Sequence, residues 1–398
     1  MHHPQITLQK TLCLFFVIVA HATFPFTEHS GFWQLYADTQ ATGAEFVATI
    51  FSYTLVPSFI FASGFLLEKS FQTTPCIGDI AGKRIKRLIV PWFLVMLFWL
   101  VPLYSLFDIP AYNRPQGSSF WATLLAGLQG RFTDHLWFLL ALFWASLFWI
   151  AARPMLDRLR IPDLSAGALK TGPAFWMEKV RARLRRYTPD WIQPEWFALH
   201  GEKPAFTVRD FAGLGLALVV AVTVHVGAKD MTWFCFREAA GPSIFLYCGM
   251  LACRHAEWLD TFLWENRAKT LPALALLFLV LLPVGKEHFL LAWFLRVLGA
   301  LLTYHTCLLF ARIGFPAKKG NGAYAYFEKN AFRFYLFHAP TVLLVFLGLN
   351  ALDILSPWFC IIATTVLTLL ITAGVVYGSH VLERTQLPKI VNGMRPEN

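Results

Sequence analysis

The hydrophobic positions of this chain gather into ten long runs that are separated by polar segments. A helix needs about 17–25 apolar residues to cross a bilayer. Most of the runs approach that length, whereas 241–253 and 271–284 are too short to span upright. The runs lack the strict alternation of a transmembrane β-barrel strand. The pattern therefore predicts an all-α integral membrane protein, a bundle of about ten transmembrane helices. The ten runs are 11–26, 44–67, 88–106, 135–152, 211–228, 241–253, 271–284, 289–310, 332–352 and 355–381.

The composition supports this interpretation and excludes other classes of protein. Of the 398 residues, 57% are hydrophobic and only 15% are charged, whereas soluble domains are roughly 45–50% apolar and about 25% charged. A soluble globule could not cover 38 Phe and 15 Trp with so few charges. The seven cysteines include no CxxC pair, so we expect neither a zinc site nor a disulfide framework.

The positive charges predict the orientation of the helices. If the N-terminus is cytoplasmic, 28 of the 34 Lys and Arg residues fall in the inner segments, and six fall outside or within the spans. This asymmetry follows the positive-inside rule. We therefore expect a multi-pass membrane protein with both termini in the cytoplasm. The net charge of +10 then reflects topology, and we expect no nucleic-acid partner.

The first apolar run has an alternative interpretation as a secretory signal peptide. Lys10, the apolar residues 11–20 and the Ala-His-Ala sequence at 20–22 imitate such a peptide and its cleavage site. A His within that site and the bulky Phe-Pro-Phe at 24–26 are poor cleavage context. Removal of this run would also break the charge alternation, so we interpret it as the first transmembrane helix.

The longest hydrophilic stretch, at about 153–209, is predicted to be a cytoplasmic insertion in a single domain that comprises 1–398. Part of this stretch has the spacing of a basic amphipathic helix, which would lie on the inner leaflet and its membrane lipids. The alternative is contact with an anionic cofactor or partner. The apolar positions of this segment are Trp176, Val180, Leu184 and Tyr187.

Ionisable residues inside the predicted spans are costly, and each is a candidate functional residue. The ordinary interpretation of each histidine is a neutral side chain that hydrogen-bonds a neighbouring helix. Lys10 and His21 are eleven residues apart, which places them near one face of a helix and about 16 Å apart along it. The ionisable residues in the spans are His21, Glu45, His225, Arg296, His305, His338 and His380.

A basic cluster precedes the third run. Arg84 and Arg87 are spaced to share one helix face, where they would jointly hold phosphates. The alternative is the ordinary anchoring of a helix end by positive charge.

Five short motifs occur in an order that resembles one family. They are KTLCLFFVIVAH at 10–21, PSFIFASGFLL at 57–67, RIKRLIVPW at 84–92, HLWFLLAL at 135–142 and RFYLFHAP at 333–340. The chain resembles membrane-bound acyltransferase family 3, which includes O-antigen acetylases, periplasmic-glucan succinyltransferases and exopolysaccharide acetylases. The first motif departs from the family pattern because Lys10 replaces an arginine, which gives a point charge in place of a planar fork.

The resemblance implies an O-acyltransferase of the bacterial inner membrane that moves an acetyl or succinyl group from cytoplasmic acyl-CoA to a hydroxyl of an extracytoplasmic glycan. Arg84 and Arg87 would bind the acyl-CoA phosphates, and Lys10 would line the same mouth. His21 would be the catalytic base, because a neutral imidazole is the side chain best suited to accept a proton near pH 7. No metal or bound cofactor is implied, and acyl-CoA acts as a co-substrate. The supporting candidates in the motifs and spans are Glu45, Ser63, His135, Trp137, Arg296 and His338.

Two other functions are compatible with a helical membrane protein. A transporter of a glycan or lipid-linked intermediate would use the buried histidines to line a pathway, but the chain shows no internal repeat. A non-catalytic subunit of an envelope-assembly complex would not require the costly His21. The acyltransferase interpretation is therefore favoured.

Overall fold

The computed structural model describes 3–27, 41–74, 76–109, 117–158, 207–227, 235, 239–285, 288–315, 322–352 and 356–384. Throughout these residues the chain forms helices and no strands. Most of the predicted cytoplasmic insertion, including its amphipathic segment, lies outside the described residues. The prediction of that insertion therefore stays a prediction.

Eight of the described helices are long and apolar enough to cross a membrane, which confirms the predicted all-α membrane bundle. The run 271–284 belongs to a helix of 19 residues and is therefore long enough to span. The eight spans are α1 with the short helix η1 (Pro4–Phe26), α2 (Ala44–Thr73), the continuous helix of α3 to α5 (Ile77–Leu106), η4 with α7 (Asp134–Arg158), α12 (Arg267–Gly285), α13 (Phe289–Arg312), α14 (Ala323–Asn350) and α15 (Pro357–Arg384).

Four further helices complete the described part of the bundle: α6 (Phe120–Leu128), α9 (Val208–Gly227), α10 (Ala240–Arg254) and α11 (Ala256–Glu265). Helices α9 and α10 correspond to two of the ten predicted spans, although neither is among the eight. With 15 residues, α10 is only about 22 Å long. The eight spans together with α9 and α10 are consistent with the predicted total of about ten transmembrane helices.

The short helix α10 packs unusually closely against α2. A Cβ atom added to Gly64 would lie 1.9 Å from the backbone oxygen of Leu246, and one added to Gly249 would lie 1.9 Å from that of Phe61. Such separations exclude any side chain, so both glycines are needed where the two backbones meet. The glycine of the Ser-Gly-Phe motif at 63–65 therefore has a packing role.

Two helices extend beyond the apolar runs that predict them, because neighbouring helices accommodate the polar residues near their ends. Helix α1 begins at Pro4, not at 11, and its buried Gln9 donates to the backbone oxygen of Ser58 at 3.1 Å. Lys10 and His21 therefore both lie on this helix, as their spacing of eleven residues predicts. The third span begins at Ile77, so the basic cluster is helical and not a loop.

The third span changes its helical pitch twice along its length. Five-residue π-helical turns, η2 (Ile85–Ile89) and η3 (Met96–Leu100), separate α3 (Ile77–Arg84), α4 (Val90–Val95) and α5 (Val101–Leu106). Pro91 and Pro102 follow these turns. Proline lacks the amide proton and displaces the carbonyl of the preceding turn, which accounts for the interruptions.

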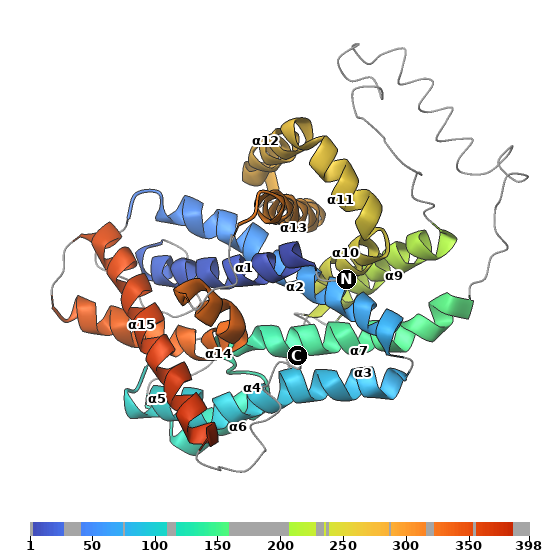
Figure 1. The fold of residues 1–398 in the computed structure, drawn as a ribbon. Coiled ribbons are helices and arrows are strands. Elements are labelled where there is room, and N and C mark those ends of the chain that lie inside the picture. Colours follow the sequence, from blue (N-terminus) through green and yellow to red (C-terminus); the bar gives the residue numbers. More distant parts are fainter. Residues whose placement is uncertain are drawn as a thin grey trace, which may run out of the picture.

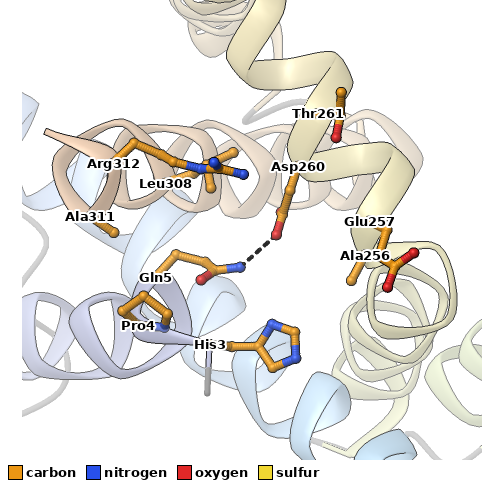
Figure 2. Close-up of a pocket in the computed structure, with 10 residues that line it drawn as sticks. All are labelled: His3, Pro4, Gln5, Ala256, Glu257, Asp260, Thr261, Leu308, Ala311 and Arg312. Atoms are coloured by element: carbon orange, nitrogen blue, oxygen red, sulfur yellow. Dashed lines mark hydrogen bonds between the residues drawn. The ribbon is translucent and has the colours of Figure 1, made fainter. Parts of the chain in front are cut away.

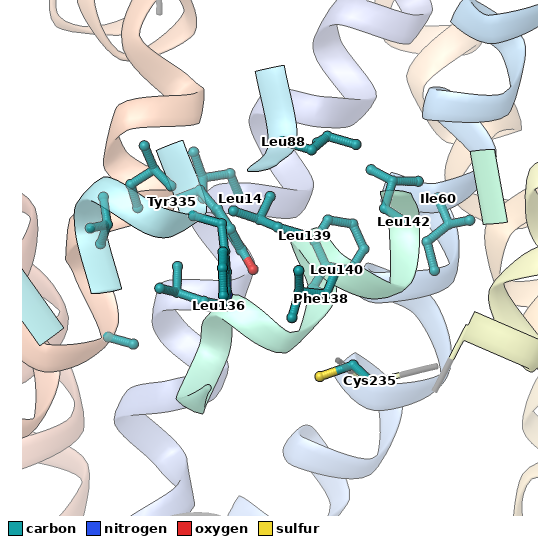
Figure 3. Packing of buried hydrophobic residues seen from close by; sticks show 14 of the residues in the cluster. Leu14, Ile60, Leu88, Leu136, Phe138, Leu139, Leu140, Leu142, Cys235 and Tyr335 are labelled. Atoms are coloured by element: carbon teal, nitrogen blue, oxygen red, sulfur yellow. The ribbon is translucent and has the colours of Figure 1, made fainter. Parts of the chain in front are cut away.

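Helix α1 lies inside the bundle, where it contacts α2, α13, α14 and α15 (Figure 1). Its Leu14 belongs to the main apolar core, together with side chains from η2, α7 and α14 such as Leu88, Leu139 and Tyr335 (Figure 3). This packing makes the first helix an integral part of the described fold and favours the transmembrane interpretation over a signal peptide.

A buried network of ion pairs joins α2, α7, α9 and α10. Both carboxylate oxygens of Glu68, whose side chain is only 2% exposed, accept from Arg153 at 3.0 and 2.8 Å. Arg254 donates to Glu68 at 3.1 Å and to Asp210 at 2.8 Å. A carboxylate this deeply buried is stable only because two guanidinium groups neutralise it.

Loss of this carboxylate should weaken the fold. We expect Glu68→Ala to reduce the free energy of unfolding by about 3–5 kcal/mol, because two partly buried arginines lose their shared partner. Asp157→Ala is the matched control, since that side chain is 44% exposed and an exposed pair contributes about 1 kcal/mol or less. Thermal unfolding of the purified protein in detergent would compare them. Equal losses of stability would contradict a structural role for the Glu68 network.

Candidate active site

Three histidines that are far apart in the sequence meet inside the bundle. His21 lies in the last turn of α1, His338 in α14 and His135 in η4 (Asp134–Leu136). Nδ1 of His21 is 3.1 Å from Nε2 of His338, although the residues are 317 positions apart. The rings of His135 and His338 have centroids 5.1 Å apart. The structure thus brings together the predicted base and two of the supporting candidates.

The ring of His338 is fully buried and anchored to its own helix. Its Nδ1 lies 2.7 Å from the backbone oxygen of Tyr335, one helical turn earlier. The rings of His21 and His338 are nearly parallel, with an interplanar angle of 18° and centroids 4.9 Å apart. His338 is therefore held on one side by the backbone and presents its other nitrogen to His21.

His135 is fixed by partners on both sides of its ring. Its Nε2 lies 3.1 Å from the backbone oxygen of Leu336 on α14, and its Nδ1 lies 3.5 Å from the buried carboxylate of Asp134. The hydroxyl of Tyr335 donates to the backbone oxygen of His135. These contacts join η4 to α14 at the level of the histidine cluster.

Asp134 adopts a conformation that is uncommon for a residue with a side chain. Its φ is +44°, in the left-handed region, and its carboxylate accepts a 2.8 Å hydrogen bond from the hydroxyl of Tyr104. Strain of this kind persists only where the surrounding contacts enforce it, and it is frequent at functional sites. Here it turns the chain so that Asp134 and His135 face the same cluster.

A small cavity opens beside His21. Its volume is about 50 Å³, which is enough for one or more waters, since one water needs roughly 10–15 Å³. His135, Trp137 and Tyr335 also line it. The remaining walls are apolar, which would strengthen any polar interaction made inside. The other lining residues are Leu14, Val17, Leu55, Val56, Phe59 and Phe138.

The three predicted donor-binding cations also come together. Lys10 on α1 lies within electrostatic range of Arg87 and of Glu328 on α14, and Arg84 is in range of Arg87. The guanidinium of Arg84 donates to the backbone oxygen of Ser63 on α2 at 3.4 Å. Arg87 thus repels both Lys10 and Arg84, Glu328 offsets part of the charge near Lys10, and a bound phosphate would relieve the remaining repulsion.

Three supporting candidates are not part of the histidine cluster: Ser63, whose backbone oxygen accepts from Arg84, and also Arg296 and Glu45. Arg296 on α13 lies over the ring of Tyr53, 5.3 Å from its centroid, and Glu45 is in the first turn of α2. Neither lines the cavity at His21. Of the other predicted histidines, His305 fits the ordinary interpretation, because its Nε2 is 3.0 Å from the backbone oxygen of Leu263.

A larger cavity of about 520 Å³ lies where α1, α11 and α13 meet (Figure 2). At its wall Asp260 accepts a 2.9 Å hydrogen bond from Gln5 and another from the hydroxyl of Tyr304. Burial raises the pKa of the Asp260 carboxyl, and these hydrogen bonds oppose the change. None of the predicted site residues lines this cavity, so the smaller one is the better candidate for chemistry.

The comparison with protein families agrees with the motifs. A family model described as an acyltransferase domain matches residues 4–377. The chain belongs to acyltransferase family 3. Neither a curated protein nor a solved structure matches it significantly. The matched region begins at the first residue of α1 and ends within α15, so it includes the first seven spans and most of the eighth.

The protein is therefore a multi-pass membrane acyltransferase, which acts on an acyl donor and an acceptor. No group of three or more His, Cys, Asp and Glu side chains within the described residues has the arrangement of a metal site. The chemistry that the cluster itself offers is proton transfer, because imidazoles accept and donate protons near neutral pH.

Several residues of this acyltransferase site were not predicted from the sequence. Tyr335 lies one helical turn before His338 in the motif at 333–340, and that spacing could have indicated it. Asp134 directly precedes the motif at 135–142. Tyr104 and Glu328 carry no local signal, because only the folded bundle brings them to Asp134 and Lys10.

Proposed function

We propose that this acyltransferase moves an acetyl or succinyl group from cytoplasmic acyl-CoA to a hydroxyl of an extracytoplasmic glycan. The observation that carries the proposal is the meeting of His21 with His338 beside a small, largely apolar cavity. Lys10, Arg84 and Arg87 supply the charges for the phosphates of the donor. Family membership supports the acyl transfer, and the donor, acceptor and direction are the proposed parts.

The reaction requires a base. The ring of His21 accepts the proton of the acceptor hydroxyl as its oxygen attacks the thioester carbonyl carbon. A carbon–oxygen bond forms, the tetrahedral intermediate collapses and the carbon–sulfur bond breaks. The departing thiolate takes the proton back from His21, so the products are an ester and the free thiol of CoA. His21 thus begins and ends the cycle in the same protonation state.

The two groups of residues are separated in a way that suits such a donor. Lys10 and His21 lie eleven residues apart on one helix, which is about 16 Å along its axis. Acyl-CoA carries its phosphates at one end and its thioester at the end of a long flexible arm. Phosphates held near Lys10 would therefore leave the thioester able to reach His21.

The function is tested by following release of the CoA thiol from purified protein. We expect release from acetyl-CoA or succinyl-CoA that depends on addition of the glycan acceptor, together with appearance of the acyl group on that glycan. Thiol release without acylated glycan would contradict the proposed acceptor. An acylated glycan formed without thiol release would contradict the proposed donor.

The direction of transfer requires the predicted topology, in which both termini and the segments around 83–87 and 175–187 are cytoplasmic. We expect an impermeant thiol reagent added from outside to label Tyr112→Cys and to spare Arg183→Cys. Both variants should be made in a Cys76→Ser background, because Cys76 is exposed. The reverse labelling pattern would reject the orientation and, with it, transfer from the cytoplasm outward.

A further inference from the structure

The hydrogen bonds around His338 determine where its proton lies. A backbone oxygen only accepts, so Nδ1 of His338 must donate to Tyr335 across 2.7 Å. A neutral imidazole has one N–H, and a charge is costly at a residue that is 0% exposed. Nε2 of His338 therefore carries the lone pair and faces Nδ1 of His21 at 3.1 Å.

This arrangement also determines the proton on His21. Since Nε2 of His338 accepts, Nδ1 of His21 must donate, and the lone pair of His21 is then on Nε2. A base needs a lone pair on the nitrogen that faces its substrate, and the partner on the opposite nitrogen sets the tautomer and the ring orientation. When Nε2 accepts a proton, Nδ1 still donates to His338, so the imidazolium keeps its hydrogen bond.

We propose that His338 is a positioning residue that fixes His21 in the tautomer with the lone pair on Nε2, under the control of the Tyr335 backbone oxygen. This inference rests on the proposed function of His21 as the base. It adds Nε2 as the atom that accepts the proton and a second histidine as the group that orients it. No negative charge is required for the orientation, because the backbone supplies the final acceptor.

The test compares two replacements of His338 that differ in one property. Gln can accept from His21 through its amide oxygen, whereas Met has a similar volume and is only a weak acceptor. We expect His338→Met to lower kcat by about 10–100-fold, as is typical when a group that orients a functional histidine is lost, with KM for acyl-CoA unchanged. His338→Gln should restore most of the lost kcat. His305→Met is the matched control, since that buried histidine bonds a different helix, and it should retain wild-type kcat.

A pH profile provides a second readout that a purely structural role would not change. Among the described residues, the ionisable groups that act on His21 include His338 from α14 and Asp134 and His135 from η4. In His338→Glu, a carboxylate would stabilise the imidazolium of His21. Protons would then leave His21 only at higher pH, so the ascending limb of the rate profile should move to higher pH.

Three outcomes overturn the inference while leaving the proposed function intact: wild-type kcat in His338→Met, equal losses in His338→Met and His338→Gln, or an unmoved limb in His338→Glu. Full activity of His21→Gln would instead refute the base itself. Each variant should first be shown to insert in the membrane and elute as a single species, and a variant that fails this check is replaced by His338→Leu.

Discussion

Replacement of His21 with Gln should reduce turnover by about 10²–10⁴-fold, the contribution typical of a positioned general base. The amide of Gln can still donate a hydrogen bond to His338, in place of the one that His21 makes at 3.1 Å. Unlike an imidazole, however, an amide does not accept a proton near neutral pH. Binding of the donor should change little, because Lys10, Arg84 and Arg87 form a separate group. Steady-state kinetics with acyl-CoA and the glycan acceptor would measure both quantities.

The control for this experiment is His305→Gln, which removes a buried histidine that is 1% exposed and lies on α13. It should leave turnover unchanged. The wild-type rate should also rise with pH along a limb that is absent in His21→Gln, because the base must be unprotonated to act. A well-expressed His21→Gln variant with normal turnover would show that a packed amide is sufficient and that His21 is structural.

The second large effect is expected at the cation group. Arg84→Ala or Arg87→Ala should raise KM for acyl-CoA by about ten- to a hundred-fold, since a charge-assisted contact to phosphate contributes about 1.5–3 kcal/mol. Arg84→Lys should recover only part of the loss, because an ammonium cannot grip two oxygens at once. Initial rates at varied acyl-CoA would measure KM, with kcat changed less.

Lys86→Ala is the matched control, because Lys86 lies in the same basic segment and is exposed like its neighbour Arg87, but it is not one of the residues proposed to bind phosphate. The interpretation as a simple helix anchor predicts that all three alanine variants behave alike and bind the donor normally. That result would remove these arginines from the donor site and leave the role of His21 untouched.

Much of the fold was predictable because a membrane imposes it. The length of the apolar runs and the placement of Lys and Arg identify most of the spans, since both follow from the thickness and polarity of the bilayer. The starts of α1 and of the third span were not predictable. In the sequence alone, Gln9 and the segment that carries Arg84 look like loop residues because they are polar. In the fold they are helical, and helix α2 supplies their hydrogen-bond partners.

The three histidines of the candidate site could be identified from the sequence, but the contacts between them could not. The motifs identified His21, His135 and His338 as separate positions. Their meeting depends on how α1, η4 and α14 pack, and the sequence carries no local signal for a contact across 317 positions. Glu45 and Arg296 were candidates because they are ionisable residues in a span, but neither lines the cavity at His21.

The central claim is that His21 drives acyl transfer from acyl-CoA to an envelope glycan. Its most direct test is mass spectrometry of the envelope glycans from cells that produce either the wild-type protein or His21→Gln at equal levels in the membrane. The account predicts a glycan heavier by one acyl group in the wild-type cells only, with the mass difference identifying acetyl or succinyl. Identical glycans in the two strains would contradict it.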